Sequence, residues 1–210
     1  MPIPQTIEAL IEEVRHLEQK IDAELEKRQE PFRYQIKKGK VIFEKELLAR
    51  QKLFKKNLFT YLSEVPLLSF LVSPVIYSII IPAVILDIFA TLYHAVCFPV
   101  YKIPKVRRSD YIIFDRHKLG YLNLLEKMNC LYCGYINGLV AYAQEISART
   151  EQRFCPISHA KKPHQTHSRY RYFFSYGDGE RYKEELFQLR LKFEDLQQRE
   201  KKEDEADAVK

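Results

Sequence analysis

The sequence contains no tryptophan and only 6 glycines among 210 residues, and one long stretch lacks lysine and arginine altogether. The scarcity of glycine, together with 10 prolines, excludes a collagen-like repeat or a flexible linker. A hydrophobic fraction of 46% beside 30% charged residues excludes a chain that is disordered throughout. The sequence also lacks a glycine-rich phosphate loop, a nucleophile elbow and an H-E-x-x-H zinc motif, which are the usual signatures of several enzyme classes.

The stretch without lysine or arginine includes an apolar run of 37 residues, Val65–Tyr101, in which Asp87 is the only formally charged side chain. One straight helix of that length would measure about 55 Å, whereas the hydrocarbon core of a bilayer is about 30 Å thick. We therefore expect a membrane helical hairpin that turns at Pro82, with Val65–Ile81 and Ala83–Tyr101 as its two legs. The alternatives are one tilted, kinked span and a helix pair buried in a soluble protein.

Basic residues flank this run on both sides and form a predicted membrane interface: Lys52, Lys55 and Lys56 before it, and Lys102, Lys105, Arg107 and Arg108 after it. Because lysine and arginine prefer the cytoplasmic side, a hairpin with both clusters on that side is favoured over a single crossing. The amino terminus alternates in charge and lacks the apolar core of a cleavable signal peptide. These patterns predict a bacterial inner-membrane protein with cytoplasmic polar regions, whose thiols stay reduced.

The predicted fold class is mainly α, with four regions. Residues 1–64 form an amphipathic helical arm with a small β-hairpin and an interfacial helix, and residues 65–101 form the membrane segment. Residues 102–176 form a basic Cys/His module, which ends in a short strand with an aromatic face at residues 170–176. Residues 177–210 form a C-terminal helix and a disordered tail.

Apolar residues at both ends of the chain have the spacing of a coiled-coil seam. The N-terminal seam consists of Ile7, Leu10, Val14, Leu17 and Ile21, and the C-terminal seam consists of Tyr182, Leu186, Leu189, Phe193 and Leu196. Each seam is short for a coiled coil that is stable by itself. The two seams are expected to pair with each other, to pair with another copy of the chain, or to pack on their own domains.

Three of the four cysteines and one histidine form a candidate metal site. Cys130 and Cys133 form a C-x2-C pair, and after 21 residues Cys155 and His159 form a C-x3-H pair. Two close ligand pairs joined by about twenty residues are typical of a chain that wraps four ligands around zinc. We therefore expect a Cys3His zinc module with a structural or protein-interaction role. Iron or an iron-sulfur cluster is the alternative occupant, and ordinary buried thiols with a surface imidazole are the alternative without a metal.

The stretch NCLYCGYINGLVAYAQEISARTEQRFCPISHAKK resembles a segment of uncharacterised bacterial membrane proteins. Those proteins carry an N-C-x-Y-C-x-Y-x-N-G block, followed by E-I-x-x-R-T-E and C-P-I-x-H-A. The resemblance covers residues 121–162 and implies that they work as a unit. It implies no particular reaction.

The alternative function is a membrane-bound metal- or thiol-dependent oxidoreductase in which Cys130 and Cys133 are reactive thiols or iron ligands. Arginines interleaved with aromatic residues at 169–176 suit anionic lipid headgroups better than nucleic acid when they lie beside a bilayer. The expected partners are therefore the lipid bilayer and, through the terminal helices, a second copy or another protein. No nucleic-acid partner is expected, and the sequence does not identify catalytic residues.

Overall fold

A computed structural model describes residues 5–29, 34–37, 40–43 and 45–197. These residues are mainly helical, as the sequence predicts, and they divide into two compact units. The first unit comprises the described residues up to Lys55 together with 119–121, and the second comprises the rest. Apart from 119–121, the described residues of 65–101, 102–176 and 177–210, which were predicted as separate regions, thus lie in one unit. The predicted disordered tail lies outside the described residues.

The first unit consists of helix α1 (Gln5–Gln29), strands β1 (Tyr34–Lys37) and β2 (Lys40–Phe43), and helix α2 (Lys45–Leu53). The two strands pair antiparallel, with Tyr34 opposite Phe43 and Ile36 opposite Val41. Residues 119–121 join this unit at α2, where the backbone amide of Gly120 donates to Oε1 of Gln51 at 2.9 Å.

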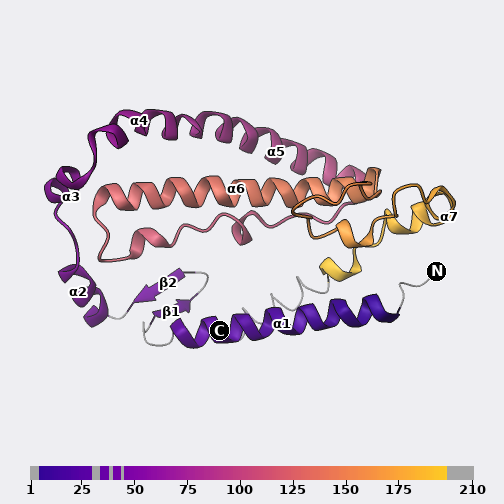
Figure 1. The fold of residues 1–210 in the computed structure, drawn as a ribbon, viewed down its shortest axis with the longest axis horizontal. Coiled ribbons are helices and arrows are strands. Elements are labelled where there is room, and N and C mark those ends of the chain that lie inside the picture. Colours follow the sequence, from indigo (N-terminus) through magenta and orange to yellow (C-terminus); the bar gives the residue numbers. More distant parts are fainter. Residues whose placement is uncertain (1–4, 30–33, 38–39, 44, 198–210) are drawn as a thin grey trace. The chain divides into compact units, whose positions relative to one another are not determined.

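The second unit begins with α3 (Leu58–Glu64), α4 (Leu67–Ser78) and α5 (Ile80–Tyr101). Because Ile79 keeps right-handed helical dihedrals, α4 and α5 continue one another as one long apolar helix, Leu67–Tyr101 (Figure 1). The predicted hairpin at Pro82 is therefore wrong. Pro82 lies in the first turn of α5, where its missing N–H needs no acceptor, so it does not end the helix.

Lys102 ends α5 in the left-handed conformation, with φ of 56°, and the chain reverses there. The backbone amide of Ile103 donates to the carbonyl of Phe98 at 2.9 Å, which closes the turn. The chain then runs back beside α6 as a largely extended return segment, residues 102–123 (Figure 1). It contains two short 3-10 turns, η2 (Arg108–Asp110) and η3 (Arg116–Lys118).

Helix α6 (Leu124–Phe154) lies beside α5 and runs in the same direction (Figure 1). It starts with a capping box: the Asn123 side chain accepts from the Glu126 amide at 3.0 Å, and Oε2 of Glu126 accepts from the Asn123 amide at 2.8 Å. The helix thus begins before Cys130 and contains both cysteines of the C-x2-C pair.

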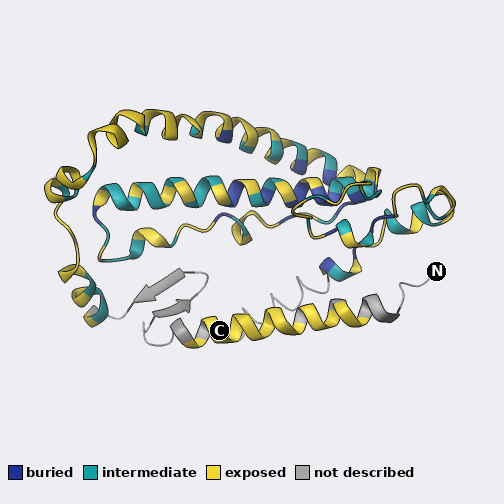
Figure 2. Cartoon of the chain, in the orientation of Figure 1, coloured by how far each residue is buried: buried dark blue, intermediate teal, exposed yellow. Residues whose placement is uncertain are grey.

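The core of the second unit lies between α5, the return segment and the C-terminal half of α6 (Figure 2). Its most deeply buried apolar members come from all three elements and from the end of the chain: Phe98, Ile103, Val106, Leu139, Tyr142, Ile146 and Phe193. Gly138 allows the close approach of α6 to the return segment, because a Cβ at this position would lie 2.5 Å from the carbonyl oxygen of Tyr111.

The region after α6 differs from the prediction in two respects. Residues 170–176 form no strand; Tyr170–Tyr172 is a 3-10 turn (η4), and a single parallel bridge joins Phe174 to Ile157. The predicted C-terminal seam is not one helix either, since α7 (Gly179–Leu189) ends before a turn and the chain is helical again from Glu194 to Gln197.

Candidate functional site

The four predicted metal ligands are distributed along and beyond α6. Cys130 is half-buried and Cys133 exposed, both more than one turn inside the helix, while Cys155 is exposed at its C-terminal end. His159 is exposed in the following loop, where its ring stacks on Tyr170. Each cysteine has a free thiol.

The structure does not bring these four side chains together. Cys133 and Cys155 are 22 residues apart on a continuous helix, and at about 1.5 Å per residue this separates their backbones by roughly 33 Å. Zinc–sulfur bonds of about 2.3 Å cannot bridge that distance. Among the residues that the structure describes, no three histidine, cysteine or acidic side chains are grouped to hold a metal. A Cys3His site within one chain would therefore require α6 to break.

The C-x2-C pair is also unlike a redox dithiol. Cys130 and Cys133 are three residues apart inside a helix, where Cβ atoms are about 5–6 Å apart, whereas a disulfide needs about 3.5–4.5 Å. Neither thiol lies at the helix N-terminus, where the helix dipole would activate it. The oxidoreductase alternative thus receives no support from the geometry of these two residues.

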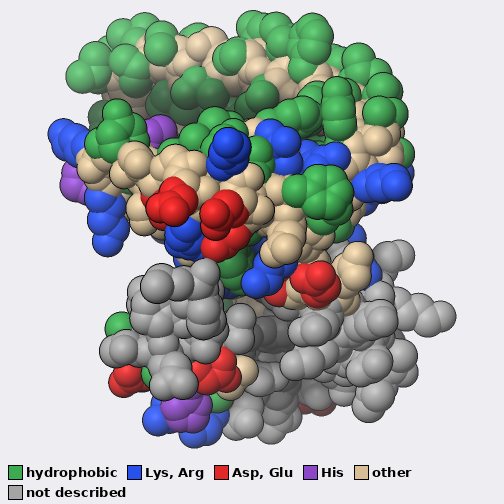
Figure 3. All heavy atoms as spheres, turned by 90° about the vertical axis from the view of Figure 1, so that its right-hand side faces the viewer, with side chains coloured by type: hydrophobic (Ala, Val, Ile, Leu, Met, Phe, Trp, Pro, Cys, Tyr) green, Lys and Arg blue, Asp and Glu red, His purple; other side chains and the backbone are tan. Residues whose placement is uncertain are grey.

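The most extensive surface feature of the second unit is the side of Leu67–Tyr101 that faces away from α6, which we call the outer face. Large apolar side chains are exposed along its whole length, including Leu68, Leu71, Val75, Ile81, Ile88 and Val96. Figure 3 shows hydrophobic side chains gathered over this helix and charged side chains set apart from them. The helix is long and apolar enough to cross a membrane.

The opposite side of the same helix, the inner face, carries the polar residues of the apolar run. Ala83, Asp87, His94 and Phe98 are spaced four, seven and four residues apart, so they form one stripe that is turned towards α6 and the return segment. Nε2 of His94 accepts a hydrogen bond from the Val106 amide at 2.9 Å, and its Nδ1 lies 3.3 Å from the Tyr142 hydroxyl.

Asp87 is part of this stripe and has three partners. Its carboxylate forms a two-point ion pair with Arg108 of the return segment and accepts from the Tyr135 hydroxyl of α6 at 2.8 Å. The Thr91 hydroxyl donates to it from within α5 at 3.2 Å. The charge of Asp87 is therefore compensated inside the unit, on the side of the helix opposite the outer face.

Polar contacts between this helix and α6 continue along most of its length. Near the start, the Tyr77 hydroxyl bonds to Asn129 and the Tyr132 hydroxyl donates to the carbonyl of Ile76. Near the end, the hydroxyls of Tyr93 and Thr150 are 3.1 Å apart. The inner face thus makes polar contacts with α6 between Ile76 and His94, and it also supplies Ala83 and Phe98 to the apolar core.

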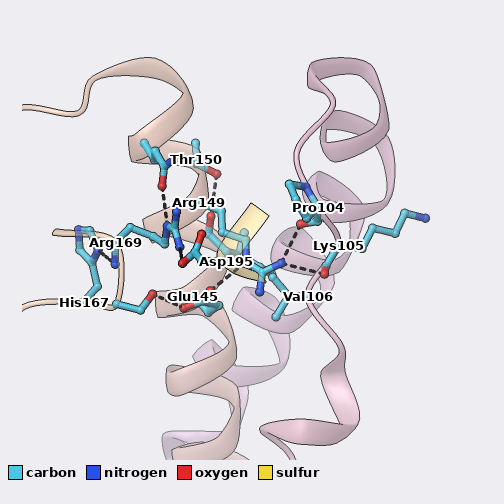
Figure 4. A network of polar contacts seen from close by, with 12 residues as sticks. Pro104, Lys105, Val106, Glu145, Arg149, Thr150, His167, Arg169 and Asp195 are labelled. Atoms are coloured by element: carbon cyan, nitrogen blue, oxygen red, sulfur yellow. Dashed lines mark hydrogen bonds and ion pairs between the residues drawn. The ribbon is translucent and has the colours of Figure 1, made fainter. Parts of the chain in front are cut away.

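A buried polar network fixes the C-terminal end of α6 (Figure 4). Arg149 binds Glu145 at 2.8 Å and donates to the carbonyls of Pro104 and Lys105, which holds the start of the return segment against the helix. Ser168 donates to the second oxygen of Glu145 at 2.8 Å. These contacts hold the return segment and the loop after α6 against the C-terminal end of α6.

Arg169 is the second centre of this network and is almost fully buried. It donates to Gln152 and to Asp195, both at 2.5 Å, and its guanidinium lies 4.6 Å from the centre of the Tyr172 ring. Burial raises the pKa of the Asp195 carboxyl, but the hydrogen bond and charge of Arg169, the hydrogen bond of Tyr172 and a backbone hydrogen bond together outweigh burial, so the net pKa lies below its ordinary value. These contacts tie the end of the described chain to α6.

The basic residues predicted as a membrane interface fall into two groups. Lys52, Lys55, Lys102, Lys105 and Arg107 are exposed, as that role requires. Lys56 forms an ion pair with Glu64 at 2.7 Å, and Arg108 forms one with Asp87. Contact of the exposed group with lipid stays a prediction.

Sequence reasoning missed the pairing of Asp87 with Arg108 and the network around Arg169. One signal for the first was present: Asp87 and His94 are seven residues apart, which places these two polar side chains on one side of a helix. The network around Arg169 has no comparable signal, because its members are far apart in the sequence.

Searches of the chain against protein-family models, curated proteins and solved structures give no match. The functional argument therefore depends on the geometry of the chain itself.

Proposed function

We propose that this protein is a monotopic membrane protein, attached to a bilayer by the outer face of Leu67–Tyr101, which lies in the plane of the interface. The observation that carries the proposal is the two-sided character of this helix. One side exposes apolar residues along its full length, while the other contacts polar groups of α6 and the return segment. An in-plane helix buries an apolar side in the interface and keeps polar groups on the other side, and here α6 and the return segment supply those polar groups.

Crossing the bilayer is the less favourable placement of this fold. α6 and the return segment accompany the apolar helix, and they carry charged residues such as Glu126, Lys127, Asp115 and Arg116. Each such charge would cost about 2.5–3.5 kcal/mol at the bilayer centre. The extended backbone of residues 102–123 would also enter hydrocarbon, where exposed irregular backbone is not tolerated.

Length supports the same conclusion. The 35 residues of Leu67–Tyr101 measure roughly 52 Å, much more than the hydrocarbon core of about 30 Å. A helix that lies in the interface has no such limit on its length. Lys102 and Lys105 are exposed at its C-terminal end, where they lie within reach of anionic headgroups.

In this proposal the polar network at the end of α6 is the rigid part of a membrane-surface scaffold. Arg149 and Arg169 hold the return segment and the C-terminal region against α6, and α6 holds the apolar helix through its inner face. The biochemical role is to position this helical unit, and whatever binds to it, at a lipid surface.

Vesicle flotation of the purified chain tests the proposal. The double variant Ile81→Glu/Ile88→Glu places two charges on the outer face, where the native side chains are 64% and 60% exposed. Two large apolar side chains contribute roughly 3 kcal/mol to membrane binding, so we expect at least about 100-fold weaker binding to phosphatidylcholine vesicles.

Phe187→Glu is the matched control, because Phe187 is 73% exposed but lies on α7. We expect this variant to float like the unmodified chain. Equal flotation of the outer-face variant and the control would reject attachment through the outer face, and loss of flotation by both would point to non-specific adsorption of exposed apolar residues.

A further inference from the structure

Helix α1 exposes a continuous apolar seam that the structure leaves without a partner among the described residues. Leu10, Val14, Leu17 and Ile21 are between 51% and 59% exposed, which is high for large apolar side chains. With Ile7 they occupy alternate a and d positions of a heptad repeat, a at Ile7, Val14 and Ile21 and d at Leu10 and Leu17. A helix with such a seam buries it against another helix.

The C-terminal seam is not available as that helix. Phe193 and Leu196 are buried in the core of the second unit, together with Phe98 and Val106, and the turn after α7 separates them from Leu186 and Leu189. An antiparallel clasp between the two ends of one chain would have to remove these two side chains from their core. The remaining partner with a matching seam is α1 of a second copy.

We propose that two copies of the chain associate through α1 and that the two helices run antiparallel. In the register of greatest overlap, Val14 packs against the partner's Leu17, and Leu10 packs against the partner's Ile21. Each of these layers occurs twice because the dimer is two-fold symmetric. The seam residues from Leu10 to Ile21 of one copy are thereby covered by those of the other, while Ile7 lies opposite the partner's Glu24.

Charges beside the seam determine the orientation. Glu13 and Lys20 occupy g positions, and in an antiparallel pair g residues face each other, so Glu13 faces the partner's Lys20. Two such attractive pairs form in the dimer. In a parallel pair Glu13 would face the partner's Glu18 instead. Glu24 occupies a d position, so in a parallel pair it would face the partner's Glu24 within the seam.

The net charge of the two halves of α1 favours the same orientation. Residues 5–18 contain four glutamates and one arginine, whereas residues 19–29 contain three acidic and three basic residues. A parallel dimer would place the two acidic halves side by side. An antiparallel dimer places each acidic half beside the neutral half of its partner, which lowers the repulsion.

Charge reversal at Glu13 distinguishes the two orientations by the sign of its effect. In the antiparallel dimer Glu13→Lys replaces two attractive pairs by two repulsive ones, so the dimer dissociation constant should rise about tenfold. The double variant Glu13→Lys/Lys20→Glu restores opposite charges and should restore the native constant. Asp22→Lys, with the same charge change at an outward b position, should have little effect.

Sedimentation of the full chain in a mild detergent, over a range of protein concentrations, gives these constants. Tighter association of Glu13→Lys would mean a parallel dimer and would overturn the proposed orientation. A chain that is monomeric at all concentrations in detergent would overturn the proposal altogether. Neither result depends on membrane attachment, so failure of this proposal is distinguishable from failure of the proposed function.

Disulfide trapping provides a second, independent readout. Leu10→Cys and Ile21→Cys are made in separate chains whose native cysteines are replaced by serine. The antiparallel register predicts a disulfide in the mixture of the two chains and little in either chain alone. Disulfides in each chain alone, joining like positions, would demonstrate the parallel arrangement and contradict the proposal.

Discussion

The guanidinium of Arg108 binds both carboxylate oxygens of Asp87, with Nη2 and Oδ2 separated by 2.6 Å. Asp87 belongs to α5 and Arg108 to the return segment, so this contact ties the apolar helix to the polar part of the unit. It also compensates the single formal charge of Leu67–Tyr101 on the inner face. The outer face can therefore enter an apolar environment without bringing an unpaired charge with it.

Removal of Arg108 should destabilise the fold by leaving Asp87 without its counter-charge. Removing one partner of a buried ion pair lowers the free energy of unfolding by about 3–5 kcal/mol. Because the Arg108 side chain is 42% exposed, we expect a smaller decrease of about 2 kcal/mol for Arg108→Met. The double variant Asp87→Asn/Arg108→Met should recover most of this loss. Urea unfolding in detergent measures both, and an unchanged free energy of unfolding for Arg108→Met would contradict the role of the pair.

Gly138 should be intolerant of any side chain. A Cβ there would lie 2.5 Å from the Tyr111 carbonyl oxygen and 2.9 Å from Cα of Ile112, so Gly138→Ala must displace the return segment and should cost about 1–3 kcal/mol.

Gly134 of the same helix is the matched control, since its added Cβ would meet only the Ile113 carbonyl oxygen at 3.6 Å. Gly134→Ala should raise the free energy of unfolding by up to about 1 kcal/mol, because alanine is the better helix former. If both substitutions stabilise the chain, α6 does not approach the return segment as closely as described.

Stability should fall in acid through Asp195. Its pKa is below the ordinary value in the folded state, so its stabilising contribution is complete above the unfolded-state pKa of about 3.9 and disappears as the pH falls through the folded-state pKa. The difference in unfolding free energy between the unmodified chain and Asp195→Asn should therefore be constant at neutral pH and shrink below about pH 4. A difference that grows on acidification would contradict the ion pair with Arg169.

Purified protein should contain no stoichiometric zinc bound by one chain. Because α6 separates Cys133 from Cys155, the four predicted ligands do not converge, and exposed Cys133 and Cys155 should react rapidly with a thiol reagent. Elemental analysis and thiol titration of the detergent-purified chain measure these properties. One zinc per chain that is lost on substitution of Cys130, Cys133, Cys155 or His159 would overturn this conclusion and restore the Cys3His prediction.

The mainly helical class and the long apolar helix were predictable because composition and periodicity are local properties of the sequence. The absence of the expected hairpin could not be predicted, because a proline inside an apolar run is compatible either with a reversing turn or with the first turn of a helix that continues the preceding one. Pro82 has the second role. The position of Asp87 and His94 on one side of a helix could be predicted from their spacing. Their contacts with Arg108 and Val106 could not, because these contacts depend on tertiary structure.

The structure does not bring the four predicted metal ligands together, for a reason that the sequence also contains. Asn123 and Glu126 have the spacing of a capping box before an apolar run, which indicates a helix start before Cys130. A helix that starts there and continues to Phe154 carries the C-x2-C pair away from Cys155. Ligand spacing alone does not distinguish a connection that folds back from one that stays straight.

Depth measurement along the outer face tests the central claim most directly. Single spin labels on cysteines introduced at Leu68, Ile85 and Val100, with the native cysteines replaced by serine, report immersion in vesicles of phosphatidylcholine and phosphatidylglycerol. The in-plane placement predicts the same shallow depth at all three positions, about 5–10 Å below the headgroups. A label at Ile85 near the bilayer centre, about 15 Å deep, with Leu68 and Val100 at opposite surfaces, would show a crossing helix and contradict the proposed attachment.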